Sequence, residues 1–511
     1  MGASEALNLP DPSSVPKTVR TWAASSPQLS TLLRGGQPMA QALARWGQAL
    51  LRETRPAEAG AAFRSALALA PDDAMLWTNY GVALDQDNQP AAAAQCLERS
   101  LTLTRQQPDS WLLLGMVKTK LGDLPGAEAS YQVALELLPN SSLTHQLLGL
   151  LKQQQRDHTA AIAHFVACLE NGGATPGVWA NLGKLYYQAG LVAEAHAAYE
   201  QASSTEASNL LYRQMTRKTR FLAQVLGERS LDDAIATFQS SFAPPEQYLE
   251  KELQDLLNSS FSFLSGFGHA IAATRIGQKQ MELWPASPSL SYLLKAVAGD
   301  PAVDRSAPEY VVAHFDDFAE GFDAQLVGAL GYDIPEKICA AVREVTGAEP
   351  LEATLDAGCG TGLCGPLLRP FTRTLSGVDL SPKMLEQAAK RAVYDALACE
   401  ELTAFLSRES ASFDLIVAAD VLVYFGDLAA LFAAAATALK PGGLLACSTE
   451  WQAGSGYRVQ PSGRFAHAPG YVLATAEPGF SQVACIETTI RMEATKRLVG
   501  NVFVFRRRSP G

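Results

Sequence analysis

The sequence predicts an all-helical solenoid in the first half of the chain and an α/β domain with a parallel sheet in the second half. Three observations lead to this prediction. Glycines recur every 34 residues between positions 47 and 183. A short apolar strand, three alternate glycines and an apolar helix follow one another from Leu351. The chain has 511 residues, which is enough for about two to four domains.

Composition excludes several classes of protein. Apolar residues make up 48% of the chain and charged residues 18%, which is typical of globular domains and not of disordered segments. The net charge is −11 and the only dense basic run is Arg506–Arg508, so no nucleic-acid partner is expected. The eight cysteines never occur in C-x-x-C spacing, so neither a zinc site nor any other metal site is expected.

The start of the chain indicates the compartment. Its first twenty residues contain prolines and no apolar stretch of the length that a secretory signal needs. No apolar run approaches the roughly 20 residues of a membrane-spanning helix. We therefore expect a cytoplasmic protein that does not cross a membrane.

The repeat of the first half has several positions in phase. A small residue follows each glycine twelve residues later, and a bulky residue follows sixteen residues later. We expect each glycine to face the small residue of the paired helix, and the bulky residue to fill the gap to the next pair. The glycines with their bulky residues are Gly47 with Phe63, Gly81 with Leu97, Gly115 with Tyr131, Gly149 with Phe165, and Gly183 with Tyr199.

This pattern resembles the tetratricopeptide repeat, with five units over residues 40–205. The remaining boundaries follow from it: an N-terminal extension over 1–39, degenerate repeats or capping helices over 206–300, a linker over 301–309 and a second domain over 310–511. The resemblance implies a groove on the inner helix faces that binds a peptide or protein. The positions expected to line it are mixed in character: Val82, Gln86, Met116, Lys120, Lys184 and Gln188.

The second domain opens with a ligand-binding pattern. Asp356 ends an apolar strand, and Gly358, Gly360 and Gly362 let the backbone pass close to a ligand. The helix that follows should offer free N–H groups to a carboxylate or phosphate. Asp379 ends the next strand, where a carboxylate can accept hydrogen bonds from a ribose diol.

The rest of the domain reads as a doubly wound sheet with an antiparallel end. Residues 413–420 form a buried strand, and the turn at Lys440-Pro-Gly-Gly leads into a strand over 444–448. The last two β-rich runs, 481–492 and 499–506, read as a closing antiparallel pair.

Two families of nucleotide-binding fold fit the glycine turn. Gly360, Gly362 and Gly365 have the G-x-G-x-x-G spacing of nicotinamide enzymes. Asp356, the Lys-Pro-Gly-Gly turn and the terminal β-pair instead resemble a class I S-adenosylmethionine-dependent methyltransferase, with its Rossmann-like seven-stranded domain, over about 310–508. The segments 312–338, 418–428 and 456–471 are similar to those of bacterial predicted methyltransferases that carry tetratricopeptide repeats.

The methyltransferase resemblance implies S-adenosylmethionine as the cofactor and a role for each matching residue. The methionine moiety is held by the turn and its acid, the ribose by Asp379, the adenine by two apolar residues and an acidic-apolar pair, and the sulfonium is bordered by the end of the fourth strand. These residues are Asp356, Gly358, Gly360, Gly362, Asp379, Leu380, Met384, Glu401, Leu402, Ala419 and Asp420.

Three residues are candidates for the methyl-acceptor site. Tyr424 can donate or accept one hydrogen bond, His467 is the candidate base, and Arg464 can hold a carboxylate or phosphate. Each also has a structural interpretation, as a core aromatic or as a loop residue that ties its own turn. Phe315, Phe318 and Phe322 form either a packed helix face or a lid over the cofactor.

The leading hypothesis is a methyltransferase whose solenoid recruits a protein or peptide that accepts the methyl group. A small-molecule O- or N-methyltransferase that uses its repeats for assembly is the first alternative. A non-enzymatic scaffold with a vestigial cofactor site is the second. Asp420-Val421-Leu422 lacks the Asn/Asp-Pro-Pro-aromatic element, which disfavours amide and base amino acceptors.

Overall fold

The computed structural model describes residues 8–227, 229–242, 249–285, 288–323, 332–347, 349–493 and 496–509. It divides into two compact units, Met1–Tyr187 with Glu194–Arg213, and Gln188–Ala193 with Gln214–Gly511. Helices α14 to α18 therefore share a unit with the sheet. The domain boundaries drawn from the sequence stay predictions.

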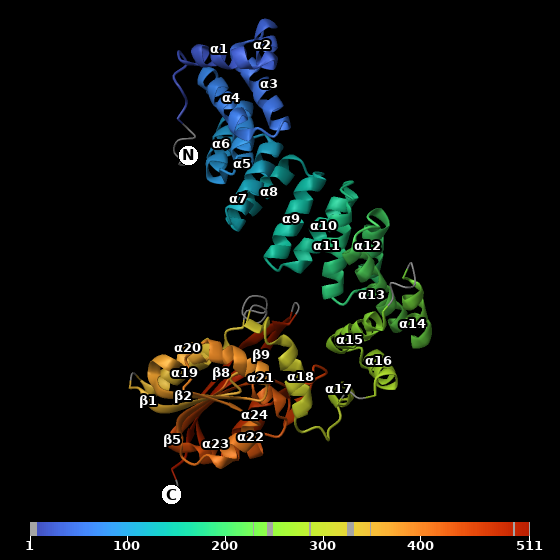
Figure 1. Cartoon of the computed structure of the whole chain (residues 1–511), viewed down its shortest axis with the longest axis vertical. Helices are drawn as coiled ribbons and strands as arrows, with labels where there is room; N and C mark the ends of the chain where they lie inside the picture. Colours follow the sequence, from blue (N-terminus) through green and yellow to red (C-terminus); the bar gives the residue numbers. More distant parts are fainter. Residues whose placement is uncertain are drawn as a thin grey trace. The chain divides into compact units, whose positions relative to one another are not determined.

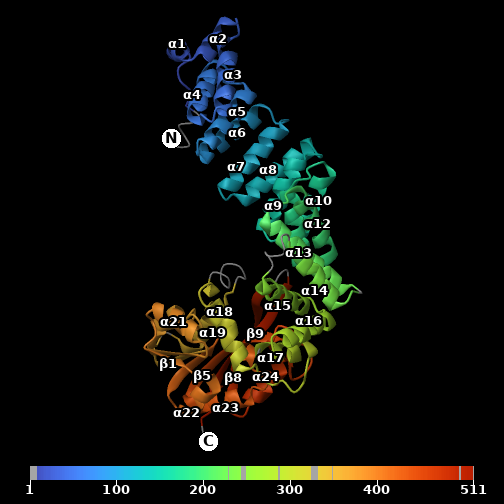
Figure 2. The same ribbon diagram turned by 45° about the vertical axis from the view of Figure 1, so that its right-hand side comes forward.

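The first unit is built of antiparallel helix pairs that follow one another along the chain (Figures 1 and 2). Most helices begin at a proline in their first turn or at a side-chain cap, as where Asp73 accepts a hydrogen bond from the Leu76 N–H. The helices are α1 Val15–Ser25, α2 Pro27–Arg34, α3 Met39–Arg52, α4 Pro56–Leu69, α5 Ala74–Gln86, α6 Pro90–Leu103, α7 Pro108–Lys120, α8 Leu124–Leu137, α9 Ser142–Gln154, α10 His158–Glu170, α11 Pro176–Gln188 and α12 Val192–Thr205.

The repeated glycines face the bulky residue of their own helix pair. A Cβ atom on Gly115 would lie 2.4 Å from the Tyr131 ring, and one on Gly47 would lie 2.8 Å from the Phe63 ring. Gly149 and Gly183 meet the rings of Phe165 and Tyr199 in the same way, and Gly81 meets the Leu97 side chain at 2.9 Å. The bulky residue was expected in the gap to the next pair, but it packs on the glycine of its own pair. At Gly81 the Ala93 carbonyl also lies 3.2 Å from the Cβ position, in line with the expected approach of the glycine to the small residue.

The second unit begins with helices and continues into the sheet. Its helices are α13 Leu210–Leu226, α14 Leu231–Ser240, α15 Glu250–Gly266, α16 Ala270–Leu283, α17 Pro288–Ala298, α18 Pro308–Phe318, α19 Ile334–Thr346, α20 Gly365–Leu368, α21 Pro382–Lys390, α22 Leu402–Arg408, α23 Ala429–Ala438 and α24 Pro469–Ala476. Its strands are β1 Leu351–Ala357, β2 Thr372–Asp379, β3 Ala396–Cys399, β4 Phe413–Ala418, β5 Leu439–Trp451, β6 Tyr457–Val459, β7 Phe465–His467, β8 Phe480–Glu493 and β9 Lys496–Arg507.

The strand order confirms the predicted doubly wound sheet. Strands β3, β2, β1, β4 and β5 lie side by side and are parallel. Strand β9 pairs antiparallel with β5 and with β8, which is the predicted closing pair. Over the described residues the sheet has nine strands, because the short hairpin β6–β7 joins the seven expected ones beside the end of β5. The chain order reverses between β1 and β4, and such a reversal leaves a crevice at the carboxyl ends of the strands.

Helices cover both faces of the sheet (Figure 1). Leu415 and Val417 of β4 pack in one core with α19, whereas Ile416 and Ala418 pack in the other core with α22 and α23. Because alternate side chains of a strand point to opposite faces, a continuous apolar run such as β4 is buried on both sides.

The segment predicted as a linker is bound to the loop after β4. The Asp304 carbonyl accepts hydrogen bonds from the Gly426 N–H at 2.7 Å and the Asp427 N–H at 2.9 Å. The Ser306 N–H donates to the Tyr424 carbonyl at 2.9 Å. These bonds make residues 304–306 part of the wall of the crevice.

The glycine contacts of the repeats generate a stability prediction. Replacing Gly115 by valine places a side chain inside the Tyr131 ring, so we expect the free energy of unfolding of the repeat unit to fall by about 1–3 kcal/mol. Urea unfolding followed by circular dichroism measures this change. Gly177→Ala is the matched control, because a Cβ there would meet nothing closer than the Thr175 hydroxyl at 4.0 Å. An equal effect of both substitutions would show that the ring can move aside.

Candidate active site

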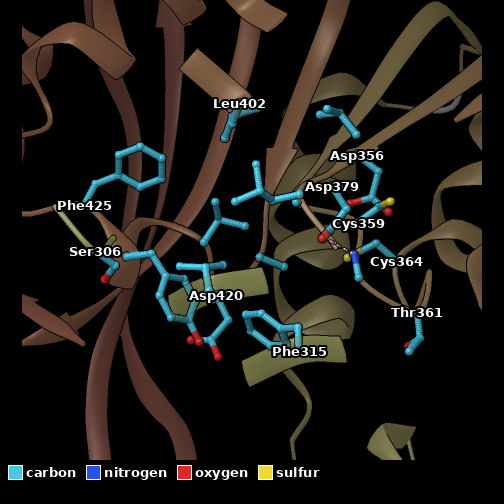
Figure 3. Close-up of a pocket in the computed structure, with 18 of the residues that line it drawn as sticks. Ser306, Phe315, Asp356, Cys359, Thr361, Cys364, Asp379, Leu402, Asp420 and Phe425 are labelled. Carbon is cyan, nitrogen blue, oxygen red and sulfur yellow. Dashed lines mark hydrogen bonds between the residues drawn. The ribbon is translucent and has the colours of Figure 1, made fainter. Parts of the chain in front are cut away.

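A pocket opens at the carboxyl ends of β1, β2 and β4 (Figure 3). Its volume is about 1130 Å³ with the open solvent at its mouth included. Most of the residues singled out from the sequence line it, namely Asp356, Gly358, Gly360, Asp379, Leu380, Glu401, Leu402, Ala419, Asp420, Tyr424 and Arg464. Gly362, Met384 and His467 are not among the lining residues.

The glycine turn after β1 has a backbone that other residues rarely adopt. Gly358 and Gly360 have φ angles of 68° and 54°. A Cβ atom on Gly358 would lie 2.4 Å from the Val421 side chain, whereas none of the described atoms lies within 4 Å of that position on Gly360. Gly358 thus makes room for the loop after β4, and Gly360 leaves the backbone open toward the pocket.

Asp379 holds the turn in place. One carboxylate oxygen accepts a hydrogen bond from the Gly360 N–H at 2.8 Å, and the other accepts one from the Ser381 N–H at 2.9 Å. Burial raises the pKa of Asp379, and these backbone donors oppose that shift. Each oxygen keeps a lone pair for a ligand hydroxyl.

Asp356, at the end of β1, is more deeply buried than Asp379. Its carboxylate accepts a hydrogen bond from the Tyr394 hydroxyl at 2.6 Å and is 1% exposed. Burial raises the pKa of Asp356 to about 7, the Tyr394 hydrogen bond lowers it, and the nearby Asp379 charge raises it. A cationic group in the pocket would stabilise the ionised form of this carboxyl group.

The helix after the turn differs from the prediction. An apolar helix was expected to offer its N-terminus to the ligand, but α20 has only four residues and continues as a 3-10 turn over Arg369–Phe371. Pro370 lies within this segment and cannot supply an interior helical N–H, which is a reason for the early end. Gly362 lies under the turn, and a Cβ there would meet Tyr394 at 3.0 Å.

One end of the pocket carries the residues predicted for adenine. Leu380 and Leu402 line this end, and Glu401 caps α22 through a hydrogen bond from the Ala404 N–H at 2.8 Å. Arg305 also pairs with Glu401, at 2.6 Å. Met384 is fully buried and does not line the pocket, so its contact with the adenine face stays a prediction.

The other end holds a network of four charged side chains. The Arg464 guanidinium lies 3.4 Å from the Asp420 carboxylate and 3.5 Å from that of Glu450. Arg491 pairs with Glu450 at 2.8 Å and lies 3.7 Å from Asp420. Glu450 and Arg491 are 3% and 5% exposed, so this network is almost entirely removed from solvent.

Strand β8 delivers Arg491 to this network through an irregularity. The register between β8 and β9 shifts between Thr489 and Arg491. A bulge of this kind redirects a side chain, here toward the end of β5. Asp420 is also irregular, with a φ of 58° and its N–H donating to the Ser448 hydroxyl at 2.8 Å. Such backbone conformations are frequent at functional sites.

Two polar atoms of this end lack hydrogen-bond partners among the described residues. They are the Asp420 Oδ1, which has only the Arg491 guanidinium at 3.7 Å as an ion-pair partner, and the Tyr424 hydroxyl, and both are buried. Burial raises the pKa of Tyr424, so the phenol stays protonated. The Arg464 guanidinium lies 5.6 Å from the centre of the Tyr424 ring. A buried polar atom without a partner is the place where a ligand group is expected to bind.

His467 lies outside the pocket. Its ring is fully buried in β7, and its Nε2 donates to the Phe425 carbonyl at 2.8 Å. Burial lowers the pKa of His467 to about 4. The interpretation of His467 as the base was therefore wrong, because the imidazole is turned to the loop that it ties down.

The three phenylalanines of the predicted lid behave differently from one another. Phe315 and Phe322 line the pocket, with ring centres 6.0 Å apart, and Phe315 also lies 5.5 Å from the Tyr424 ring. Phe318 is 43% exposed and does not line the pocket. Figure 3 shows Phe315 and Asp420 among the residues that line the pocket.

Two known protein families match this chain, one in the repeats and one in the domain with the sheet. The family described as "Tetratricopeptide repeat" matches residues 44–108, 81–142 and 147–208. The family described as "Methyltransferase domain" matches residues 355–447, which include the glycine turn, Asp379 and the loop after β4. This chain contains tetratricopeptide repeats and a methyltransferase domain.

The second half of the chain is similar to individual methyltransferases of other organisms. A protein of Methylocella silvestris named "Ubiquinone biosynthesis O-methyltransferase" is 33% identical over 105 residues, which are 20% of this chain and 41% of that protein. The N-methyltransferase NodS of Bradyrhizobium japonicum with S-adenosyl-L-homocysteine has a TM-score of 0.33 and 19% identity, over 39% of this chain and 99% of that one. The 1,6-didemethyltoxoflavin-N1-methyltransferase of Burkholderia thailandensis has a TM-score of 0.32 and 18% identity, over 40% of this chain and 93% of that one.

These findings confirm the predicted class of the domain and its place after the repeats, and the nucleoside cofactor follows from the class. The chain spans about two fifths of the length of the Methylocella relative. Among the described residues, no helix is both long and apolar enough to cross a membrane. The same residues contain no group of three or more His, Cys, Asp or Glu suited to a metal ion.

Several residues of the methyltransferase domain were missed in the sequence. Tyr394 and Glu450 carry no motif, and Arg491 and Arg305 lie far from the glycine turn in the chain. The alternation of β8 would have placed Arg491 correctly only if the bulge had been known.

The raised pKa of Asp356 predicts a pH-dependent stability difference. Its folded value of about 7 lies above the 3.8 of an exposed carboxyl, so the stabilisation from protonation is complete below pH 4 and is lost as the pH rises through 7. Asp356→Asn stays neutral, so we expect its melting temperature to rise relative to wild type between pH 5 and pH 8. Thermal melts of the ligand-free protein measure this difference.

Asp395→Asn is the matched control for this comparison. A backbone hydrogen bond from Leu375 and the pairing with Arg369 lower the pKa of Asp395, so its effect should not change between pH 5 and pH 8. Parallel pH profiles of wild type and Asp356→Asn would contradict a buried, readily protonated Asp356.

Proposed function

We propose that the chain transfers the methyl group of S-adenosylmethionine to an oxygen atom of a small molecule. The observation that carries this proposal is the convergence of the glycine turn, Asp356, Asp379 and Asp420 on one pocket at the switch point of the sheet. S-adenosylmethionine is a cation with a ribose diol, and three carboxyl groups in one pocket suit it. The name of the Methylocella relative supports an oxygen acceptor.

Each end of the pocket has a task in this proposal. Asp379, oriented by two backbone N–H groups, accepts hydrogen bonds from the ribose hydroxyls. Asp356 attracts the ammonium group of the methionine portion. Leu380, Leu402 and Glu401 hold the adenine ring. Gly358 and Gly360 let the cofactor lie against the backbone.

The acceptor binds at the end with the charged network. The cofactor supplies a methyl group on a positively charged sulfur, and the protein aligns the acceptor oxygen with it. The Asp420 Oδ1, which has no described hydrogen-bond partner, takes the hydroxyl proton of the acceptor. The Tyr424 hydroxyl orients the acceptor, and Arg464 keeps Asp420 in place.

The burial of this end favours a small acceptor, in contrast to the ranking from the sequence. Tyr332 and Tyr424 are 7% and 9% exposed, and Phe315 covers the same region. The second candidate is a protein acceptor, and the tetratricopeptide repeats favour it because such repeats offer a binding groove for peptides. In either case we propose that the repeats bind a peptide or protein partner.

Asp379→Asn should weaken the binding of S-adenosylhomocysteine. The substitution removes charge-assisted hydrogen bonds worth about 1.5–3 kcal/mol, which corresponds to roughly a 10- to 150-fold increase of the dissociation constant. Isothermal titration calorimetry measures it. Glu352→Gln is the control, because Glu352 is an exposed acid at the opposite end of the neighbouring strand β1. Equal affinity of wild type and Asp379→Asn would place the ribose elsewhere.

The class of acceptor is tested by the fate of the methyl group. Cell extract is incubated with S-adenosylmethionine labelled in its methyl group and either wild-type protein or Asp379→Asn. We expect wild-type protein to transfer label to the small-molecule fraction, and Asp379→Asn to transfer much less. Label that appears only in protein would contradict a small acceptor and favour the captured protein.

A further inference from the structure

Residues 308–323 form a segment that we name the strap. It consists of α18 and the turn that follows, and it lies outside the residues matched by the methyltransferase family. Phe315 and Phe322 of the strap line the pocket, as do Pro308 and Val311. The strap is thus one wall of the cofactor pocket, built by sequence that precedes the sheet.

One carboxylate of the strap reaches the loop after β2. The Ser381 hydroxyl donates a hydrogen bond to the Asp316 carboxylate at 2.6 Å. The same hydroxyl oxygen accepts one from the Met384 N–H and caps α21, while the Ser381 N–H donates to Asp379. Asp316 therefore binds Ser381, and Ser381 in turn orients Asp379, the residue proposed to bind the ribose.

A second carboxylate of the strap reaches the glycine turn. The Thr361 hydroxyl donates to the Asp323 carboxylate at 2.5 Å. Asp323 also pairs with Arg391, whose Nε donates to the Thr361 carbonyl at 2.6 Å. The side chain and the carbonyl of Thr361, between Gly360 and Gly362, are thus both held by one ion pair.

The two contacts join opposite sides of one pocket. Thr361 and Asp379 both line it, and Figure 3 shows Phe315, Thr361 and Asp379 around the same space. A ligand bound to the glycine turn and to Asp379 has the strap rings as its third wall. The strap, the glycine turn and the loop after β2 thus surround the same space.

We propose that Asp316 and Asp323 are positioning residues that latch the strap onto the two cofactor loops and set the lifetime of the bound nucleoside. This inference rests on the proposed function, because it requires the nucleoside to occupy the pocket. The latch fixes the glycine turn through Thr361 and the ribose acid through Ser381. The latch also gives a role to Asp316 and Asp323, the two carboxylates that lie beside Phe315 and Phe322 in the strap.

The test measures the association and dissociation rates of S-adenosylhomocysteine with the full chain by stopped-flow fluorescence. We expect Asp323→Asn, Asp316→Asn and Thr361→Val each to raise the dissociation rate about tenfold or more, with a smaller change in association. The double variant Asp323→Asn with Thr361→Val should raise the dissociation rate by less than the product of the two single effects, because both substitutions weaken the same bond between Thr361 and Asp323. Thr361→Ser keeps the hydroxyl and should retain the slow release.

Glu320→Gln is the matched control, since Glu320 is an exposed acid of the same strap and should release the nucleoside as wild type does. Wild-type dissociation rates in Asp323→Asn, Asp316→Asn and Thr361→Val would overturn the latch while the proposed function stands. A lower melting temperature with unchanged dissociation would also overturn it and leave the carboxylates a structural role. Absence of binding to the wild-type protein would instead overturn the proposed function.

Discussion

The site depends on the carboxylate of Asp379, because its two oxygens bind backbone N–H groups from two different loops. The Gly360 N–H comes from the turn after β1, and the Ser381 N–H comes from the start of α21. Removing a carboxylate from water is costly unless such donors replace the lost hydration. The turn can present its N–H in this direction because Gly358 and Gly360 adopt positive φ angles. Strand register, loop conformation and electrostatics therefore support one another at this point.

The opposite end of the pocket is organised by balanced charge. Two arginines and two carboxylates are packed together, and each member is within ion-pair distance of a member of opposite sign. Buried ion pairs of this kind seldom stabilise a fold relative to apolar packing, but they fix the geometry of the groups involved. Asp420 and Arg464 line the pocket, whereas Glu450 and Arg491 do not, and the two arginines together determine where the Asp420 carboxylate points.

The two units differ in how far apart in the chain their contacts lie. In the repeats, each glycine meets a bulky side chain sixteen residues later in its own helix pair, so the packing is local and repeats along the chain. In the methyltransferase domain, one pocket collects residues from Arg305 to Arg464, and Arg491 stands behind it. A substitution in a repeat is therefore expected to act locally, whereas one in the pocket can act through distant strands.

The sequence by itself determined the repeat, the doubly wound sheet and the residues at the strand ends. Those features depend on local periodicity, on glycine conformation and on the rule that ligands bind where parallel strands end. Asp356, Asp379, Gly358 and Gly360 were therefore placed in the pocket correctly. The contact of each bulky residue with the glycine of its own pair was not predicted, because it depends on how the two helices of a pair pack together.

Only the tertiary structure decided which distant side chains complete the pocket. A bulge in β8 turns Arg491 inward, and a hydrogen bond to the Phe425 carbonyl turns His467 away from the pocket. Neither orientation has a local sequence signal, since each depends on which strand pairs with which and in what register. The full burial of Met384 has no local sequence signal either, because it depends on the layers that pack against α21.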